Sequence, residues 1–179
     1  MAWRSRRAIA EVGGLRMIET SGPVVGSARP TLDGTAGFAA EGRFGKALAV
    51  TPPGGSVKLA PGTALKSEAF TMMAWVKFKP AGRYGLVMER LGERDDQRQA
   101  VLVAHCEDGH AYLHGGTGSA VKVDDDRWHH LAATFDGKMH RFYVDGKMQS
   151  QAAAKDVPRP AKVSMNIGGH PLGSNTRPT

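Results

Sequence analysis

Three Asp-Gly dipeptides, each lying between two short runs with apolar residues, constrain the fold of this chain most strongly. They are Asp108-Gly109, Asp136-Gly137 and Asp145-Gly146. Asp-Gly favours the positive φ angles of tight hairpin turns. The runs on either side of each dipeptide are therefore predicted to be neighbouring antiparallel strands.

The segment 70–78 has the clearest strand pattern. One face would carry Phe70, Met72, Ala74, Val76 and Phe78, and the other Thr71, Met73, Trp75 and Lys77. Further strands are expected at 57–60, 85–91, 100–104, 111–113, 121–123, 128–135, 139–144 and 163–167. Two of these strands present apolar rows that we expect to share one core: Leu131, Ala133 and Phe135 in one, and His140, Phe142 and Val144 in the other. Only 94–99 and 149–155 favour a helix, and each is too short and too poorly patterned to form a stable one.

Eight to ten short strands with frequent turns predict an all-β fold. The chain of 179 residues contains 23 glycines and 10 prolines, which suits many turns, and its length fits one domain. Short antiparallel strands bury one face each by stacking two sheets or by closing one. We therefore expect a single antiparallel β-sandwich domain.

Composition excludes several function classes. The formal charge is +7, but Lys and Arg are scattered from Arg4 to Arg177, which is typical of a solvated basic surface and not of a nucleic-acid-binding one. No apolar run approaches the roughly 20 residues of a membrane-spanning helix. A single cysteine, Cys106, excludes an internal disulfide. The basic start resembles the first part of a secretion signal, but Glu11 and Gly13 interrupt the apolar stretch that should follow.

Four segments in order resemble a known family, the LamG-like jellyroll of the concanavalin A-like lectin/glucanase superfamily. They are 70–77 (FTMMAWVK), 128–137 (WHHLAATFDG), 142–147 (FYVDGK) and 167–169 (IGG), and upstream 42–48 (GRFGKAL) and 19–22 (ETSG) also resemble the family pattern. The resemblance runs from about residue 14 to residue 169. It implies a jellyroll domain over 14–179 behind a basic tail over 1–13, and a non-catalytic module of a secreted or surface protein that recognises carbohydrate or protein.

The family pattern usually closes with a last strand that carries a glycine, an aliphatic residue and an acidic pair. Nothing of that kind follows Gly169. A missing closing strand would leave an unpaired edge on its neighbours. We therefore expect the domain to be incomplete at its C-terminus, with a further domain or chain completing the sheet.

Acidic residues do not form a hydrolase pattern. Glycan hydrolases of this superfamily use alternating carboxylates on one strand, and the sequence contains no Glu-x-Asp-x-x-Glu motif. The run Asp124-Asp125-Asp126 is interpreted as a solvated turn, with calcium ligation as the alternative. Family members often carry calcium, for which Asp33, Asp124 and Asp145 are the available carboxylates. Asp145 is better explained as a hairpin-turn residue.

Other residues also fail to form a recognisable catalytic or metal site. His105, Cys106, His110 and His114 are types that bind zinc, but on a strand a four-residue separation spans about 13 Å, too far for one ion. His129 and His130 point to opposite faces of a strand and have no Gly-x-Ser-x-Gly nucleophile. The glycine-rich stretch 115–118 lacks the Lys and helix of a phosphate-binding loop and is interpreted as a hairpin loop.

Aromatic residues supply the remaining binding candidates. Trp75 and Trp128 would suit stacking on a sugar, but their framework positions favour core packing, and Tyr84, Tyr112 and His110 are looser candidates. No ligand-binding residue is assigned from the sequence. The prediction is a recognition module that binds glycan or protein through loops at one rim. The alternatives are a structural or adhesion spacer, a fragment of a larger multidomain protein, and a remnant of a glycoside hydrolase or another enzyme whose catalytic part lies outside this chain.

Overall fold

The computed structural model describes residues 31–50, 55–59, 69–78, 85–91, 98–105, 108–113, 117–154 and 164–169. Thirteen strands lie in these ranges: β1 (Thr31–Gly34), β2 (Gly37–Gly42), β3 (Gly45–Ala49), β4 (Gly55–Leu59), β5 (Phe70–Lys77), β6 (Gly85–Leu91), β7 (Arg98–His105), β8 (His110–Leu113), β9 (Gly118–Lys122), β10 (Trp128–Phe135), β11 (Met139–Val144), β12 (Lys147–Ala153) and β13 (Ser164–Ile167). In these ranges, no helix has the length and apolarity needed to cross a bilayer.

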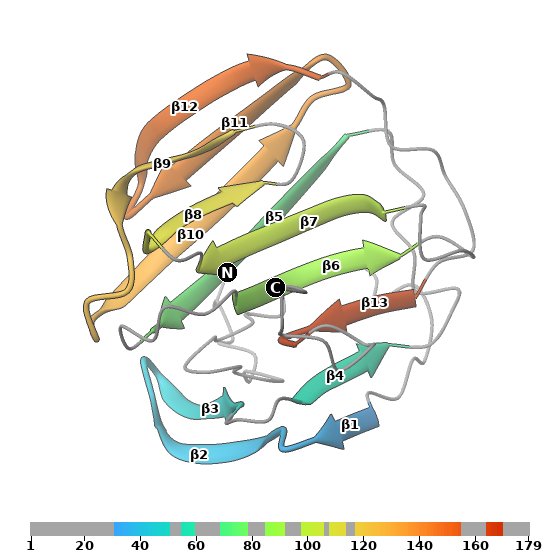
Figure 1. Ribbon diagram of the computed structural model, residues 1–179, viewed down its shortest axis with the longest axis vertical. Coiled ribbons are helices and arrows are strands. Elements are labelled where there is room, and N and C mark those ends of the chain that lie inside the picture. Colours follow the sequence, from blue (N-terminus) through green and yellow to red (C-terminus); the bar gives the residue numbers. More distant parts are fainter. Residues whose placement is uncertain are drawn as a thin grey trace, which may run out of the picture.

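Two antiparallel sheets form the sandwich. Seven strands pair in the order β1-β4-β13-β6-β7-β8-β9, and four pair in the order β12-β11-β10-β5. In Figure 1 strands β5 and β10 overlap with β7 and β8. Buried side chains from both sheets form one core. A separate hairpin, β2-β3, lies beside them. The predicted all-β antiparallel sandwich is confirmed.

Alternation along the strands explains the core. Buried and half-buried positions alternate without interruption along β10 and β11. The four-stranded sheet supplies Met72, Ala74, Val76, Leu131, Ala133, Phe135, Phe142 and Val144, and the seven-stranded sheet supplies Val57, Val87, Met88, Ala111, Leu113 and Ile167. The two apolar rows predicted for 128–135 and 139–144 therefore share one core, as expected.

The three Asp-Gly dipeptides predicted to form hairpin turns adopt turn geometry. Gly109, Gly137 and Gly146 have positive φ angles, and Asp145 does too, with φ 50 before the φ 77 of Gly146. Two consecutive positive φ angles are those of a type I′ hairpin turn. This turn joins β11 to β12 and fixes their pairing from Val144 and Lys147 onward.

Several strands differ from the prediction. The sequence over 149–155 favours a helix, but Lys147–Ala153 form strand β12. Strand β9 begins at Gly118, three residues before the predicted start, so Gly118 belongs to a strand and not to a loop. Strands β1, β2 and β3 were not among the predicted strands. Their polar or glycine-rich sequences lack the alternation that identifies a half-buried strand.

Side chains join β9 to β12 where the two sheets meet. The Ser150 hydroxyl accepts from the Gly118 amide at 3.0 Å and donates to the Gly118 carbonyl. The Gln149 side-chain oxygen accepts from the Ala120 amide at 3.3 Å. These bonds explain why a polar, poorly alternating segment is held as a strand.

Strand β13 lies inside the seven-stranded sheet. It pairs with β4 through Met165 and Leu59, and with β6 through Asn166 and Glu89. The expected incompleteness beyond Gly169, and the tail over 1–13, concern residues outside the described ranges. Both stay predictions.

Candidate functional site

The outer face of the four-stranded sheet carries a continuous band of apolar and aromatic side chains. Cross-strand pairing aligns Met73 with Ala132, Tyr143 and Met148, and aligns Trp75 with His130 in the next row. Met73 is 43% exposed and Met148 54%, while the other members are half-buried. We call these residues the outer band: Met73, Trp75, His130, Ala132, Tyr143 and Met148. Adjacent strands lie about 4.8 Å apart, so the apolar surface extends across four strands.

The tip of the β2-β3 hairpin extends the outer band at Trp75. The Phe44 ring meets the Trp75 ring edge-on, with centroids 5.7 Å apart and an interplanar angle of 78°. This is a favoured geometry for two aromatic rings. Phe44 nevertheless remains 48% exposed. An exposed aromatic ring is therefore held in a defined position beside the sheet.

Trp75 corrects one prediction. Core packing was favoured for Trp75 and Trp128, but both side chains are half-buried at outward positions and neither belongs to the hydrophobic core. Toward the neighbouring strand β10, the Trp75 ring lies against the His130 ring at a centroid distance of 5.3 Å. The reason is the strand period: Trp75 falls on the face opposite Met72, Ala74 and Val76, which fill the core.

His130 contributes an uncharged ring to this surface. Burial lowers the pKa of His130, and the negative charge of Asp145 opposes that shift only in part. A lowered pKa keeps the imidazole neutral at neutral pH. Trp75 and His130 therefore form a ring surface without a charge of its own.

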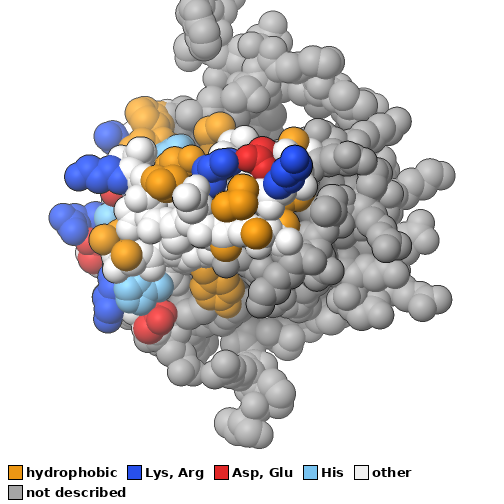
Figure 2. Space-filling model, turned by 90° about the horizontal axis from the view of Figure 1, so that it is seen from above, with side chains coloured by type: hydrophobic (Ala, Val, Ile, Leu, Met, Phe, Trp, Pro, Cys, Tyr) orange, Lys and Arg blue, Asp and Glu red, His pale blue; other side chains and the backbone are white. Residues whose placement is uncertain are grey.

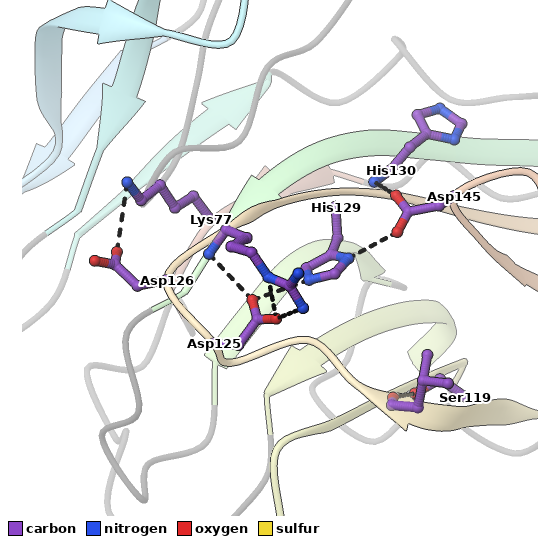
Figure 3. A network of polar contacts seen from close by, with 9 residues as sticks. Lys77, Ser119, Asp125, Asp126, His129, His130 and Asp145 are labelled. Carbon is purple, nitrogen blue, oxygen red and sulfur yellow. Dashed lines mark hydrogen bonds and ion pairs between the residues drawn. The ribbon is translucent and has the colours of Figure 1, made fainter.

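His129, on the inward side of β10, connects two turns. Its Nδ1 lies 2.8 Å from Oδ2 of Asp145, and its Nε2 lies 3.0 Å from Oδ1 of Asp125 (Figure 3). Asp145 also accepts from the His130 amide at 2.8 Å. Burial raises the pKa of Asp145, but the bonds from the His130 amide and the His129 ring outweigh it and the pKa is lowered. The prediction that His129 and His130 face opposite sides is confirmed, and His129 serves as a structural link.

The Asp124–126 run forms a turn, as predicted. Asp125 accepts from the amide of Arg127 at 3.1 Å and from its Nε at 2.6 Å, and Asp126 has φ 59. Asp126 also forms a 3.5 Å ion pair with Lys77, which Figure 3 shows beside the His129 link. The side-chain hydrogen bond from Arg127 lowers the pKa of Asp125 to about 2, with a further contribution from His129.

Acid is expected to destabilise the fold through Asp125. A carboxyl whose pKa is lowered in the folded state stabilises that state above its unfolded pKa, about 3.8, and this stabilisation is lost as the pH falls toward about 2. The melting temperature should therefore fall between about pH 4 and pH 2, and it should fall less in Asp125→Asn. Thermal melts by circular dichroism across this range test the expectation. Asp126→Asn, in the same turn, is the control because an exposed pair contributes little; equal curves for both variants would contradict the assignment.

The three aspartates available for calcium lie in different environments. Asp33 on β1 forms a 2.5 Å ion pair with Lys58 of β4, and Asp145 bonds to the two histidines. Asp124 lies against Gly109, where a Cβ atom would come within 2.2 Å of its Oδ1. Across the described ranges, no group of three His, Cys, Asp or Glu side chains has the arrangement that a metal ion needs.

The other candidates of the sequence are distributed over β7 and β8. His110 begins β8 and its Nδ1 lies 3.1 Å from the Ser119 carbonyl oxygen, while Tyr112 is half-buried on the same strand. His105 ends β7. Cys106, His114 and Tyr84 lie outside the described residues. Neither His110 nor Tyr112 is part of the outer band.

The sequence did not identify Phe44, or the buried pair of polar side chains Glu89 and Asn166 in the seven-stranded sheet, as candidate functional residues. Glu89 on β6 is fully buried, and Asn166 of β13 donates to its Oε1 at 3.3 Å. Phe44 contacts Trp75, which lies 31 positions later in the chain. No local sequence pattern predicts a contact between residues so far apart. The outward face of 70–78 was the one available signal, because it places Met73 and Trp75 side by side.

Comparisons with known proteins agree with this architecture. Domain 4 of AbnA, a GH43 extracellular arabinanase from Geobacillus stearothermophilus solved in complex with arabinotriose, matches with a TM-score of 0.60 at 19% identity, over 77% of this chain and 72% of that chain. Domains LG4-5 of the mouse laminin alpha1 chain match with a TM-score of 0.53 at 14% identity, over 69% of this chain and 34% of that chain. These likenesses show the fold. No curated protein sequence matches significantly.

The family model described as the concanavalin A-like lectin/glucanases superfamily, Laminin_G_3, matches residues 52–179. This range covers most of the chain and contains the strands of the sandwich from β4 to β13. The chain therefore belongs to the Laminin_G_3 family of the concanavalin A-like lectin/glucanases superfamily.

Proposed function

We propose that this chain is a non-catalytic recognition module that binds carbohydrate on the outer band, with Phe44 as an aromatic contact. The observation that carries the proposal is the half-exposed Phe44 ring, held by Trp75 beside the outer face of the sheet. This surface differs from the loop rim predicted from the sequence. It consists of side chains on rigid strands and one hairpin tip.

The chemistry of a sugar suits such a surface. A pyranose or furanose ring presents an apolar C–H face, which packs on an aromatic ring, and hydroxyl groups at its edge, which need polar partners. Beside the apolar rows lies a polar row in which Thr71 pairs with Thr134, Thr134 with Arg141 and Arg141 with Gln151. The outer face thus combines an apolar band with hydrogen-bonding groups.

The carboxylates near the outer band support a binding role over catalysis. A glycosidase needs two carboxyl groups on either side of the scissile bond, about 5–10 Å apart. Asp126 pairs with Lys77, Asp136 pairs with Arg141 at 2.6 Å, and Asp145 bonds to the histidines. Each is committed to a structural contact. The arabinanase whose domain shares this fold is described as extracellular, and we propose the same location for this module.

A second candidate function is docking to a protein. Met73 and Met148 are the two most exposed members of the outer band. Methionine is flexible and polarisable, and it is common on surfaces that adapt to protein partners. An adhesion or spacer role would use the same face without a sugar contact.

Phe44→Ala is expected to weaken carbohydrate binding about tenfold, because an aromatic contact contributes on the order of 1 kcal/mol beyond its buried area. The first probe is arabinotriose, followed by an array of neutral and acidic oligosaccharides, with affinities measured by calorimetry with and without calcium. Bound sugar should also raise the melting temperature, because a ligand that prefers the folded state stabilises it.

Leu32→Ala is the matched control for Phe44→Ala, since Leu32 is 44% exposed on β1, away from the outer band. Its affinity should equal that of the unmodified chain. Loss of binding in both variants would point to unfolding. Unchanged binding in Phe44→Ala would rule out Phe44 as a sugar contact, and absence of binding to every sugar would favour the protein-docking function.

A further inference from the structure

We propose that Arg43 makes the surface beside the outer band selective for acidic sugars, those that carry a carboxylate, over neutral ones. This inference rests on the proposed carbohydrate-binding function and names its substrate class. Arg43 and Phe44 are neighbours at the tip of the β2-β3 hairpin. The tip would therefore present an apolar and a cationic contact side by side.

The Arg43 guanidinium is held in place by two aromatic rings. Its Cζ atom lies 4.9 Å from the Phe44 ring centroid and 5.0 Å from that of Trp75. Both distances are within the range of cation–π attraction. Arg43 remains exposed while it makes these contacts. Its position is thus fixed without occupying its N–H groups, since an aromatic face is not a hydrogen-bond acceptor comparable to a carboxylate.

Arg43 differs from Lys77 and Arg141, two cations on the strands of this face. Lys77 is neutralised by Asp126, and Arg141 by Asp136, which its Nη1 contacts at 2.6 Å. In the part of the chain that the structure describes, Arg43 has no carboxylate partner. Arg43 therefore offers a guanidinium without an ion-pair partner among the described residues at the hairpin tip.

A uronic acid matches both contacts. Its ring offers a C–H face to Phe44, and its planar carboxylate fits the planar guanidinium through two parallel hydrogen bonds. The formal charge of +7 would attract a polyanionic chain over a longer range. Figure 2, seen from the end of the molecule where β12 lies, shows that hydrophobic side chains adjoin Lys and Arg side chains there as well. A sulfated sugar carries the same charge, but its tetrahedral group lacks the planar match.

The test compares three oligosaccharides of equal length: an oligogalacturonate, a neutral galacto-oligosaccharide and a sulfated one. The unmodified chain should bind the oligogalacturonate about tenfold or more tightly than the neutral probe, because hydrogen bonds to charged groups are the strong ones. Arg43→Gln should abolish this preference, so that the acidic and the neutral probe bind with equal affinity. Arg43→Lys should retain part of it, since the ammonium keeps the charge and loses the planar fork.

Lys122→Gln is the matched control, because it removes the same charge from β9 on the other sheet. It should retain the preference for oligogalacturonate. Equal affinity of the unmodified chain for acidic and neutral probes, or an unchanged preference in Arg43→Gln, would overturn this inference while leaving carbohydrate binding intact. A stronger preference for the sulfated probe would overturn the choice of carboxylate, and no binding to any probe would overturn both proposals.

Discussion

Phe142→Ala is expected to lower the free energy of unfolding by about 3–5 kcal/mol, the range for removing a buried phenylalanine. Phe142 is fully buried in the core of the sandwich, and it pairs with Ala133 of β10 on one side and Ser150 of β12 on the other. Because small residues flank it, the ring fills space that its neighbours cannot reach after truncation. The cavity would remain, and its cost adds to the lost burial.

Urea denaturation followed by tryptophan fluorescence measures this loss. Met148→Ala is the control, because Met148 is 54% exposed on the adjacent strand, and surface changes usually alter stability by less than about 0.5 kcal/mol. A loss in Phe142→Ala no greater than that of the control would show that the ring does not hold the two sheets together. If Phe142→Ala fails to fold, Phe142→Leu gives a smaller loss of the same sign.

Gly55→Ala is expected to destabilise the fold by about 2–4 kcal/mol, because the new methyl group meets backbone and not a movable side chain. A Cβ atom on Gly55 would lie 2.3 Å from the Ala36 amide nitrogen and 2.6 Å from the Asp33 carbonyl oxygen. Gly55 pairs with Gly34 where β4 meets β1. The turn after β1 would have to move away from β4.

Gly37→Ala makes the same chemical change without the contact. Among the described residues, no heavy atom other than those of Gly37 and its two chain neighbours lies within 4 Å of a Cβ built on Gly37. This variant should be neutral or more stable by up to about 1 kcal/mol, because alanine restricts the unfolded chain. Thermal melts and urea curves of the two variants decide the matter. Similar stabilities for both would mean that β1 is not packed on β4 through Gly55.

Much of the four-stranded sheet could be predicted from the sequence, because its signals are local. The dipeptide Asp145-Gly146 predicts the hairpin turn between β11 and β12. The alternation of apolar and polar residues predicts which side chains of β5, β10 and β11 face the core. Strand β12 was missed because its residues are polar and it is held by pairing and by Ser150. Local propensity cannot report bonds to a partner 32 positions away.

The candidate site was predicted less well, for a related reason. Alternation places Trp75 on one face, but it does not say whether that face is a second core or a solvated surface. The structure decides this through the β2-β3 hairpin, whose tip brings Arg43 and Phe44 onto Trp75. The contact depends on where a long connection places a turn, and composition and spacing do not encode that.

The side-chain bonds between β9 and β12 have a consequence for how copies of this protein behave when concentrated. A strand at the margin of a sheet normally offers its amides as a template on which another molecule can add a strand, the first step toward fibrils. On β9 the amides of Gly118 and Ala120 already donate to Ser150 and Gln149. An incoming strand would have to displace both bonds, so this margin of the sandwich is protected against polymerisation by its own hydroxyl and amide groups.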